Sequence, residues 1–298
     1  MRILFTGANG FLGRNVIPVL KTKGYKVNTL SRTGSDYNTD LSKEIPAILG
    51  DFEIVFHAAG KAHFLPKNEV ENKLFFDTNL VGTQNLCKSL QIAGVPKYFY
   101  FISSVAVYGA DSGENIDEDA PLRGNSPYAK SKIATEEFLR IWCDKNNVIL
   151  YILRPSLIAG KNPPGNLGDM INAIRSGKYV NVGGGKAKKS VLWAEDFAQV
   201  IEKGITKSGG VYNVCDDIHP DFQAFSKIIS LKLNRKMPQN IPFFIIKSVA
   251  LLGDLLGSKF PLNSKKLEKI TNSLTFSNSK IKAELDFKPT NVIQNFKL

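Results

Sequence analysis

Tyr128 and Lys132 are the two side chains of this sequence best suited to move a proton. They are four residues apart, so on a helix both face the same way. A nearby ammonium favours the phenolate and lowers the pKa of a tyrosine, which lets the tyrosine act as a general base near neutral pH. Ser104 lies 24 residues before Tyr128, at the end of an expected strand. Because the carboxyl ends of such strands meet the active-site crevice, its hydroxyl can hydrogen-bond the reacting oxygen. A Tyr-x-x-x-Lys pattern alone is common on protein surfaces, and only its conjunction with other motifs indicates catalysis.

A glycine loop near the N-terminus provides the second motif. Gly7, Gly10 and Gly13 follow an apolar run and open a helical pattern, the context that a dinucleotide-binding loop requires. A side chain at Gly7 would obstruct the tight turn, one at Gly10 would block the pyrophosphate, and Gly13 lets the helix pack closely on the strand. The helix N-terminus supplies amide donors to the phosphates. The alternative is a glycine turn without a ligand. The predicted cofactor contacts of the loop are Gly7, Asn9, Gly10, Phe11, Leu12 and Gly13.

The end of the second expected strand bears on which dinucleotide binds. NAD enzymes usually place an acidic residue there, whereas a nearby arginine suits the 2′-phosphate of NADP. Ser31 and Arg32 occupy this position, and the first acidic residue after them is Asp36. The sequence therefore admits NAD or NADP and favours NADP. We expect Asp40 and Leu41 near the adenine.

Both motifs depend on elements that alternate along the chain. Strands are expected at 2–6, 26–31, 53–57, 97–102 and 148–153, and helices at 11–23, 68–93 and 127–146. This alternation predicts an α/β fold with a doubly wound parallel sheet of the Rossmann type. A last strand is expected at 211–214. The predicted domains are a dinucleotide-binding domain at 1–165, to which 192–215 return, and a smaller, mostly helical C-terminal substrate lobe formed by 166–191 and 216–298.

The composition is ordinary for a globular enzyme, with 43% hydrophobic and 22% charged residues. The three cysteines are far apart, which fits a reducing compartment and argues against a zinc site. His57, His63 and His219 do not cluster either, so we expect no metal. Because the first residues run directly into a strand, no signal peptide is expected and the protein is predicted to be cytoplasmic.

The net charge of +12 permits acidic partners. The sequence lacks a basic run interleaved with aromatic residues, so nucleic-acid binding is not expected. The most apolar stretch, 241–257, is shorter than the roughly 20 residues that span a bilayer. Ile245, Val249, Leu252 and Leu256 recur there at helical spacing, which predicts a buried amphipathic helix and no membrane partner.

Seven segments, in order, resemble the extended short-chain dehydrogenases/reductases of the NAD(P)-dependent epimerase/dehydratase family, which act mostly on nucleotide sugars. They are 6–13, 56–59, 79–83, 103–109, 128–132, 153–155 and 279–289, and they cover nearly the whole chain. The resemblance implies that Tyr128 is the general acid/base, that Lys132 binds the cofactor ribose and tunes Tyr128, and that Ser104 orients the substrate hydroxyl. It also suggests a homodimer through the two long helices. The further cofactor contacts that it implies are Ala58, Ala59, Gly60, Asn79, Ile102, Pro155 and Ser156.

Two departures from the family narrow the chemistry. Its 4,6-dehydratases carry an Asp-Glu pair just after the catalytic hydroxyl residue, and its 3,5-epimerase/reductases carry a cysteine two residues after the catalytic serine. Val105 and Ala106 stand at these places instead. What remains is a 4-epimerase or 4-ketoreductase of a nucleotide-diphosphate sugar. The alternatives are a reductase of a non-sugar carbonyl and a non-catalytic dinucleotide sensor that regulates a partner. The predicted substrate contacts are Lys61, Ser104, Val105, Asn166 and Lys189.

Overall fold

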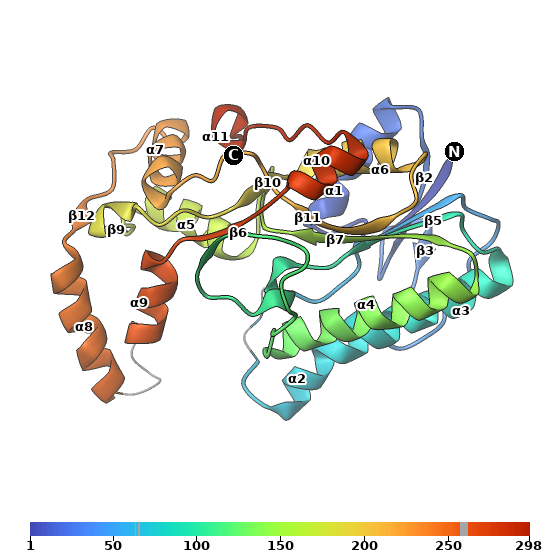
Figure 1. The fold of residues 1–298 in the computed structure, drawn as a ribbon, viewed down its shortest axis with the longest axis horizontal. Helices are drawn as coiled ribbons and strands as arrows, with labels where there is room; N and C mark the ends of the chain where they lie inside the picture. The colour runs from blue at the N-terminus through green and yellow to red at the C-terminus, as the bar shows by residue number, and fades with distance from the viewer. Residues whose placement is uncertain (63, 65, 257–261) are drawn as a thin grey trace.

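Seven parallel strands form one sheet at the centre of the molecule (Figure 1). The structure is a computed structural model that describes residues 1–62, 64, 66–256 and 262–298. The strand order is β11-β7-β5-β4-β1-β2-β3, which confirms the predicted doubly wound α/β sheet and the late return of residues 211–214. The strands are β1 (Arg2–Thr6), β2 (Lys26–Ser31), β3 (Tyr37–Asn38), β4 (Ile54–His57), β5 (Tyr98–Ile102), β7 (Ile149–Pro155) and β11 (Gly210–Val214).

Helices cover both faces of this sheet because its strands are apolar on both sides. In β1, Ile3 and Phe5 join one hydrophobic layer and Leu4 joins the other. The first layer lies under α1 (Phe11–Thr22), α6 (Phe197–Gly204) and α10 (Ser279–Leu285). The second lies under α3 (Gly82–Ala93) and α4 (Pro127–Lys145), on the opposite side of the sheet (Figure 1).

The helices α2 (Glu69–Phe76) and α4 each begin after a residue whose side chain caps the helix. Asn68 caps α2 and accepts a hydrogen bond from the backbone nitrogen of Glu71 at 2.9 Å. A single π-helical turn, Asp77–Val81, then joins α2 to α3. Ser126 caps α4 and accepts from the backbone nitrogen of Ala129 at 3.1 Å.

The second lobe lies beyond the carboxyl edge of the sheet. It is built around α5 (Gly165–Arg175) and α7 (Phe222–Lys232), which share one hydrophobic cluster. Although α10 falls within 216–298, it packs against β11 and α6 on the sheet. The paired strands of the lobe are β6 (Gly113–Ile116) with β13 (Leu274–Phe276), β8 (Leu157–Ala159) with β10 (Val191–Trp193), and β9 (Asn181–Val182) with β12 (Asn240–Ile241); its other helices are α8 (Phe243–Leu256), α9 (Ser264–Thr271) and α11 (Val292–Asn295).

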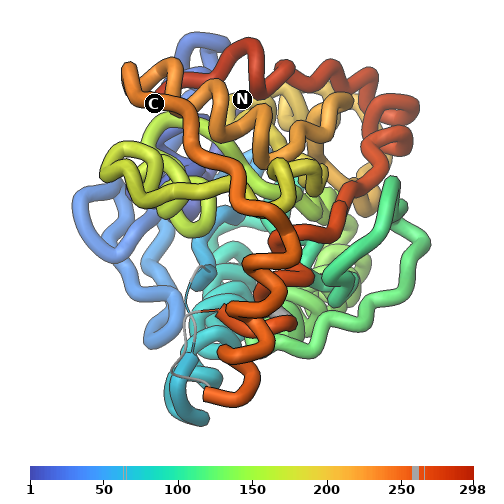
Figure 2. Tube along the Cα trace, turned by 90° about the vertical axis from the view of Figure 1, so that its left-hand side faces the viewer, coloured from blue at the N-terminus to red at the C-terminus, as the bar shows by residue number. Residues whose placement is uncertain are grey.

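The helix α8 lies in an environment that differs from the predicted one. Its small residues Ala250 and Gly253 are buried, whereas Ile245, Leu252 and Leu256 are exposed. The prediction of a buried helix is therefore wrong, because the small residues face the protein and the large apolar ones face outward. Figure 2 shows α8 in front of the lobe, on the outer side of the molecule. In the described part of the chain, no helix has the length and apolarity to cross a bilayer.

Candidate active site

The glycine loop joins β1 to α1 in a conformation that requires its glycines. Gly7 has a φ of +72°, and a Cβ there would lie 2.8 Å from the backbone nitrogen of Ala59. A Cβ on Gly13 would lie 2.0 Å from the carbonyl oxygen of Ala8, so α1 packs on the loop too closely for any side chain. At Gly10, the N-cap of α1, the nearest atom to a Cβ would be the Gly7 oxygen at 3.0 Å. The loop thus presents bare backbone at a helix N-terminus, which suits a pyrophosphate.

A cavity of about 510 Å³ opens beside this loop, within the usual size range of ligand-binding pockets. Its walls come from the carboxyl ends of β1, β2 and β4, as expected for a doubly wound sheet. Phe11, Leu12 and Gly13 lie in the first turn of α1. The cavity brings together the predicted cofactor contacts Gly7, Asn9, Gly10, Ser31, Arg32, Asp40, Leu41, Ala58, Ala59 and Gly60, and the predicted substrate contact Lys61.

The end of β2 places Arg32 on the wall of this cavity. Asp36, the first acidic residue after the strand, accepts hydrogen bonds from the backbone nitrogen and Oγ1 of Thr29, at 2.7 and 2.8 Å. The Asp36 carboxylate is therefore hydrogen-bonded to Thr29 of β2. The Asp40 carboxylate accepts from Ser42 Oγ at 2.7 Å, and this hydrogen bond holds its pKa below the usual value. The residues present fit a dinucleotide at this end of the site.

Ser104, Tyr128 and Lys132 meet where β5 ends. Ser104 follows the last strand residue, Ile102, by two positions, and α4 presents Tyr128 and Lys132 one turn apart. The Ser104 hydroxyl lies near the Tyr128 phenol and lowers its pKa, and Ser104 Oγ accepts from the backbone nitrogen of Ala106 at 3.1 Å. Lys132 Nζ donates to the Ile102 carbonyl oxygen at 2.7 Å and lies 3.3 Å from where a Cβ on Gly60 would stand. Lys132 therefore adjoins the dinucleotide cavity through Gly60, one helical turn from Tyr128.

The electrostatics of Tyr128 and Lys132 differ from the sequence prediction. Burial lowers the pKa of Lys132 to about 8, although the Glu136 carboxylate acts in the opposite direction. Burial raises the pKa of Tyr128 above its usual value, and the nearby Ser104 hydroxyl offsets this only in part. The predicted lowering of the Tyr128 pKa by Lys132 is wrong here, because desolvation of the phenol dominates and the ammonium donates to a backbone carbonyl. At neutral pH the phenol keeps its proton and is suited to donate it.

The π-helical turn Asp77–Val81 places Asn79 between the cavity wall and α4. Asn79 Oδ1 accepts from the backbone nitrogen of Lys61 at 2.8 Å, and its Nδ2 donates to Ser131 Oγ at 2.8 Å. Ser131 Oγ in turn donates to the Tyr128 carbonyl oxygen at 2.8 Å. Asn79 thus ties the wall of the cavity to the helix that carries Tyr128. Such turns are frequent at functional sites.

A buried ionic network behind these residues is absent from the sequence predictions. The side chains of Glu136 and Arg154 are each 2% exposed and form an ion pair at 2.6 Å. Arg154 Nη1 donates to the Tyr108 hydroxyl at 3.0 Å, and Glu136 accepts from the Ser103 hydroxyl. The network fixes the ends of β5 and β7 against α4. The sequence spacing places Glu136 one helical turn after Lys132 on the same face of α4, but it does not indicate that Arg154 is its partner.

At the end of β7, Pro155 is followed by Ser156. The Ser156 hydroxyl is buried and has no hydrogen-bond partner among the described residues. A buried hydroxyl without a partner costs free energy unless a ligand or a water supplies one. The position of Ser156 therefore fits the predicted contact near the nicotinamide.

The remaining predicted substrate contacts lie apart from one another. Val105 opens a 3-10 turn directly after Ser104, and Asn166 is exposed in the first turn of α5. Lys189 Nζ donates to the carbonyl oxygens of Lys269 and Asn272, at 3.1 and 2.9 Å. Lys189 thus holds the end of α9 in the structure, and its contact with a substrate diphosphate stays a prediction.

His57 is held by two threonines at the end of β4. Its ring nitrogens lie 2.7 and 2.8 Å from the hydroxyl oxygens of Thr6 and Thr83. Burial, together with the charge of Lys132, lowers its pKa to about 3, so the ring stays neutral. It packs against Phe99 and Phe101.

The metal-binding prediction concerns the other histidines as well. His63 lies outside the described residues. Within residues 1–62, 64, 66–256 and 262–298, no group of three or more His, Cys, Asp or Glu side chains is placed to hold a metal ion.

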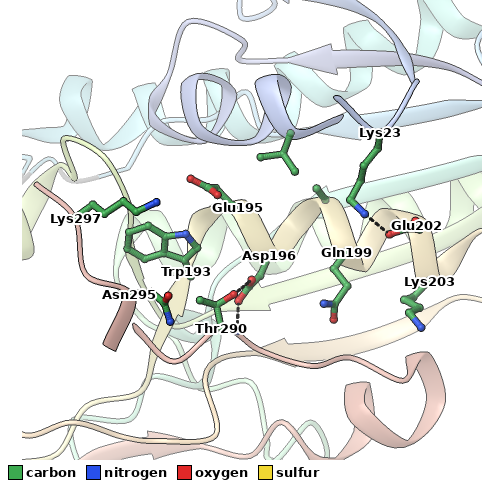
Figure 3. A pocket seen from close by; sticks show the side chains of 12 residues that line it. Lys23, Trp193, Glu195, Asp196, Gln199, Glu202, Lys203, Thr290, Asn295 and Lys297 are labelled. Atoms are coloured by element: carbon green, nitrogen blue, oxygen red, sulfur yellow. Dashed lines mark hydrogen bonds and ion pairs between the residues drawn. The ribbon is translucent and has the colours of Figure 1, made fainter. Parts of the chain in front are cut away.

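A second cavity, of about 380 Å³, lies between α1, α6 and the C-terminal segment (Figure 3). Asp196 points toward Thr290 there and accepts from its backbone nitrogen and hydroxyl, at 2.9 and 2.6 Å. Burial raises the pKa of Asp196 to about 6. Among the described residues that line this cavity, none belongs to the predicted site. Its contacts fix the C-terminal segment on α6.

Known proteins resemble this chain in sequence and in fold. Residues 3–215 match the NAD dependent epimerase/dehydratase family. The N-acetyl-alpha-D-glucosaminyl-diphospho-ditrans,octacis-undecaprenol 4-epimerase of Escherichia coli O157:H7 is 26% identical over 94% of this chain and 88% of that relative. The human sterol-4-alpha-carboxylate 3-dehydrogenase, decarboxylating, is 27% identical over 82% of this chain and 70% of that relative. The solved structure of Thermus thermophilus UDP-glucose 4-epimerase in complex with NAD has a TM-score of 0.70 at 21% identity, covering 97% of this chain and 94% of the other.

Proposed function

Because the chain belongs to the NAD-dependent epimerase/dehydratase family, we propose that it is an NAD(P)-dependent oxidoreductase acting at one carbon of a nucleotide-diphosphate sugar, as a 4-epimerase or a 4-ketoreductase. One observation carries this proposal: Lys132, one helical turn after Tyr128, places its Nζ at the end of β5 and beside Gly60 in the wall of the dinucleotide cavity. A bound dinucleotide supplies the donor or acceptor of hydride. The chain supplies the proton transfer and the positioning.

The proton is handled by Tyr128 at the oxygen of the reacting carbon. In reduction, the neutral phenol donates its proton to the carbonyl oxygen as the carbon receives hydride. In oxidation, the same oxygen returns its proton to Tyr128. The Ser104 hydroxyl, which lies near the phenol and lowers its pKa, holds the reacting oxygen against Tyr128. The raised pKa of Tyr128 keeps the phenol protonated at neutral pH, which is the form that reduction requires.

Two assays distinguish epimerase from ketoreductase. Purified protein is incubated with UDP-glucose or UDP-N-acetylglucosamine without added cofactor, and the 4-epimers are separated by chromatography. A second incubation supplies a UDP-4-keto sugar and NADPH, and follows loss of reduced nicotinamide. Formation of a 4-epimer identifies an epimerase with retained dinucleotide, whereas NADPH consumption alone identifies a ketoreductase. Absence of both reactions would refute the proposed function.

A second candidate substrate is a diphosphate sugar carried on a polyprenyl lipid. The name of the Escherichia coli relative describes a 4-epimerase of such a molecule, and the exposed apolar face of α8 in the substrate lobe favours this candidate here. The sugar and the diphosphate are common to both substrates, so the roles of Tyr128 and Ser104 stay the same. Replacing the UDP-sugar by undecaprenyl-diphosphate N-acetylglucosamine in detergent tests it, and turnover of the UDP-sugar alone excludes it.

We also propose a homodimer through α3 and α4. A groove of about 380 Å³ runs between these helices and is lined by Gln84, Cys87, Lys88, Gln91, Phe138 and Trp142. Ile92 and Ile141 are exposed on the same two helices. A second copy would cover these apolar side chains. Light scattering after gel filtration measures the mass, and a monomer at micromolar concentration contradicts the proposal.

A further inference from the structure

The outer face of α8 is apolar although it is exposed. Phe244, Leu251 and Leu255 are 70, 52 and 84% exposed, and their spacing of seven and four residues places them on one side of the helix. Ala250 and Gly253 are buried on the opposite side. This is the reverse of a helix that packs its apolar face on a core. The outward apolar stripe consists of Phe244, Ile245, Leu251, Leu252, Leu255 and Leu256.

The orientation of α8 is fixed at both of its ends. At the N-terminal end, a Cβ on Gly183 would lie 3.6 Å from Phe243, which shows how closely the helix approaches the loop after β9. At the C-terminal end, Asp254 accepts hydrogen bonds from the backbone nitrogen and the hydroxyl of Ser264, at 3.1 and 2.5 Å. These contacts therefore hold the apolar stripe in a fixed orientation on the surface of the lobe.

The chain around α8 is strongly basic. Residues 232–269 contain eight lysines and arginines and two acidic residues. Lys232, Arg235, Lys236 and Lys247 are exposed. Two copies docked through their α8 helices would bring these like charges together, which opposes self-association. Anionic lipid headgroups complement the same charges, and acyl chains accept the apolar stripe.

We propose that α8 docks this protein on the surface of an anionic membrane. The helix of 14 residues lies in the plane of the interface, with its apolar stripe among the upper acyl segments and the surrounding lysines at the headgroups. Such a helix rests on the bilayer without crossing it. This revises the sequence expectation of no membrane partner. The docking involves none of the contacts of the dinucleotide site, although the same apolar face also favours the polyprenyl-linked candidate substrate.

Vesicle co-sedimentation of the full chain tests this docking. Vesicles contain phosphatidylcholine and phosphatidylglycerol in about equal amounts, or phosphatidylcholine alone. The variants are Leu255→Asp on the stripe and, as a matched control, Leu49→Asp, because Leu49 is similarly exposed (78%) but lies before β4, away from the stripe. Both substitutions replace an exposed leucine by a carboxylate, so circular dichroism should show the same folded spectrum for both.

We expect wild type and Leu49→Asp to pellet with the anionic vesicles, and their binding to weaken on phosphatidylcholine alone. Leu255→Asp should partition at least about tenfold more weakly, since a leucine is lost from the acyl region. Wild type that stays in the supernatant, or Leu255→Asp that binds as tightly as wild type, overturns the proposal. So does a Leu255→Asp variant that turns a dimer into a monomer with unchanged vesicle binding, which would identify a second copy as the occupant.

Discussion

Glu136 and Arg154 form an ion pair at 2.6 Å, with both side chains buried, directly behind Lys132 and the end of β5. Because it joins α4 to β7, the pair fixes the two elements that carry Tyr128 and Pro155. The positions of the candidate catalytic side chains thus depend on two buried charged groups that lie behind them.

Removing one partner of this pair should strongly destabilise the protein. Arg154→Met leaves the Glu136 carboxylate buried without its cation, and we expect a loss of about 3–5 kcal/mol in the free energy of unfolding. Arg140→Met is the control, because Arg140 lies 3.8 Å from the same carboxylate but is half exposed; its loss should stay below about 1 kcal/mol. Urea denaturation measures both. Equal losses would contradict the structural role of the buried pair.

Two glycine substitutions should separate cofactor binding from folding. Gly13→Ala places a Cβ 2.0 Å from the Ala8 oxygen, so it should lower both the melting temperature and dinucleotide affinity. Gly10→Ala meets its nearest atom at 3.0 Å, so the fold should survive while the methyl group obstructs the pyrophosphate. Calorimetry with NADP and thermal denaturation make the comparison. Wild-type affinity in Gly10→Ala would argue against phosphate binding at this loop.

The stability of the protein should depend on pH through His57. Its pKa is lowered from 6.5 to about 3 in the folded state, so between these values the unfolded chain binds a proton that the folded chain does not. Stability from this group is present above pH 6.5 and is lost as the pH falls toward 3. Between pH 6.5 and 3, the free energy of unfolding of the wild type should therefore fall by about 1.4 kcal/mol more per pH unit than that of His57→Gln. Parallel slopes for the two proteins in urea denaturation would exclude a neutral buried His57.

Arg32→Asp should weaken NADP binding about tenfold or more, because it removes the cation that we expect to pair with the 2′-phosphate and adds an anion. NAD, which lacks that phosphate, should lose much less. Arg175→Asp, at the end of α5, provides the same charge change away from the cavity. Titration of both dinucleotides by calorimetry decides the matter. If the affinities for NAD and NADP fall equally in Arg32→Asp, Arg32 does not bind the 2′-phosphate.

The sheet and the glycine loop could be predicted because local patterns determine them. Gly7, Gly10 and Gly13 are specified by turn geometry and close packing, and Ser126 with Pro127 marks the start of α4. Contacts between segments distant in sequence could not be predicted. No local pattern indicates that Glu136 meets Arg154, or that a π-helical turn at 77–81 aims Asn79 at Ser131.

The helix α8 shows the limit of hydrophobic periodicity. Its spacing of apolar residues is the same whether the stripe faces a core or a membrane surface, and only the position of Ala250 and Gly253 in the fold distinguishes the two. The pKa of Tyr128 illustrates the same limit, because its burial depends on packing around α4 rather than on the distance to Lys132 along the sequence.

Tyr128→Phe is the sharpest test of whether Tyr128 transfers the proton during hydride exchange. The variant keeps the ring that packs near Phe75 and loses only the hydroxyl. Turnover of the substrate identified in the epimer and ketoreduction assays should fall by roughly 10²–10⁴-fold, while dinucleotide affinity measured by calorimetry stays at the wild-type value. Turnover at the wild-type rate in Tyr128→Phe would show that Tyr128 does not transfer the proton.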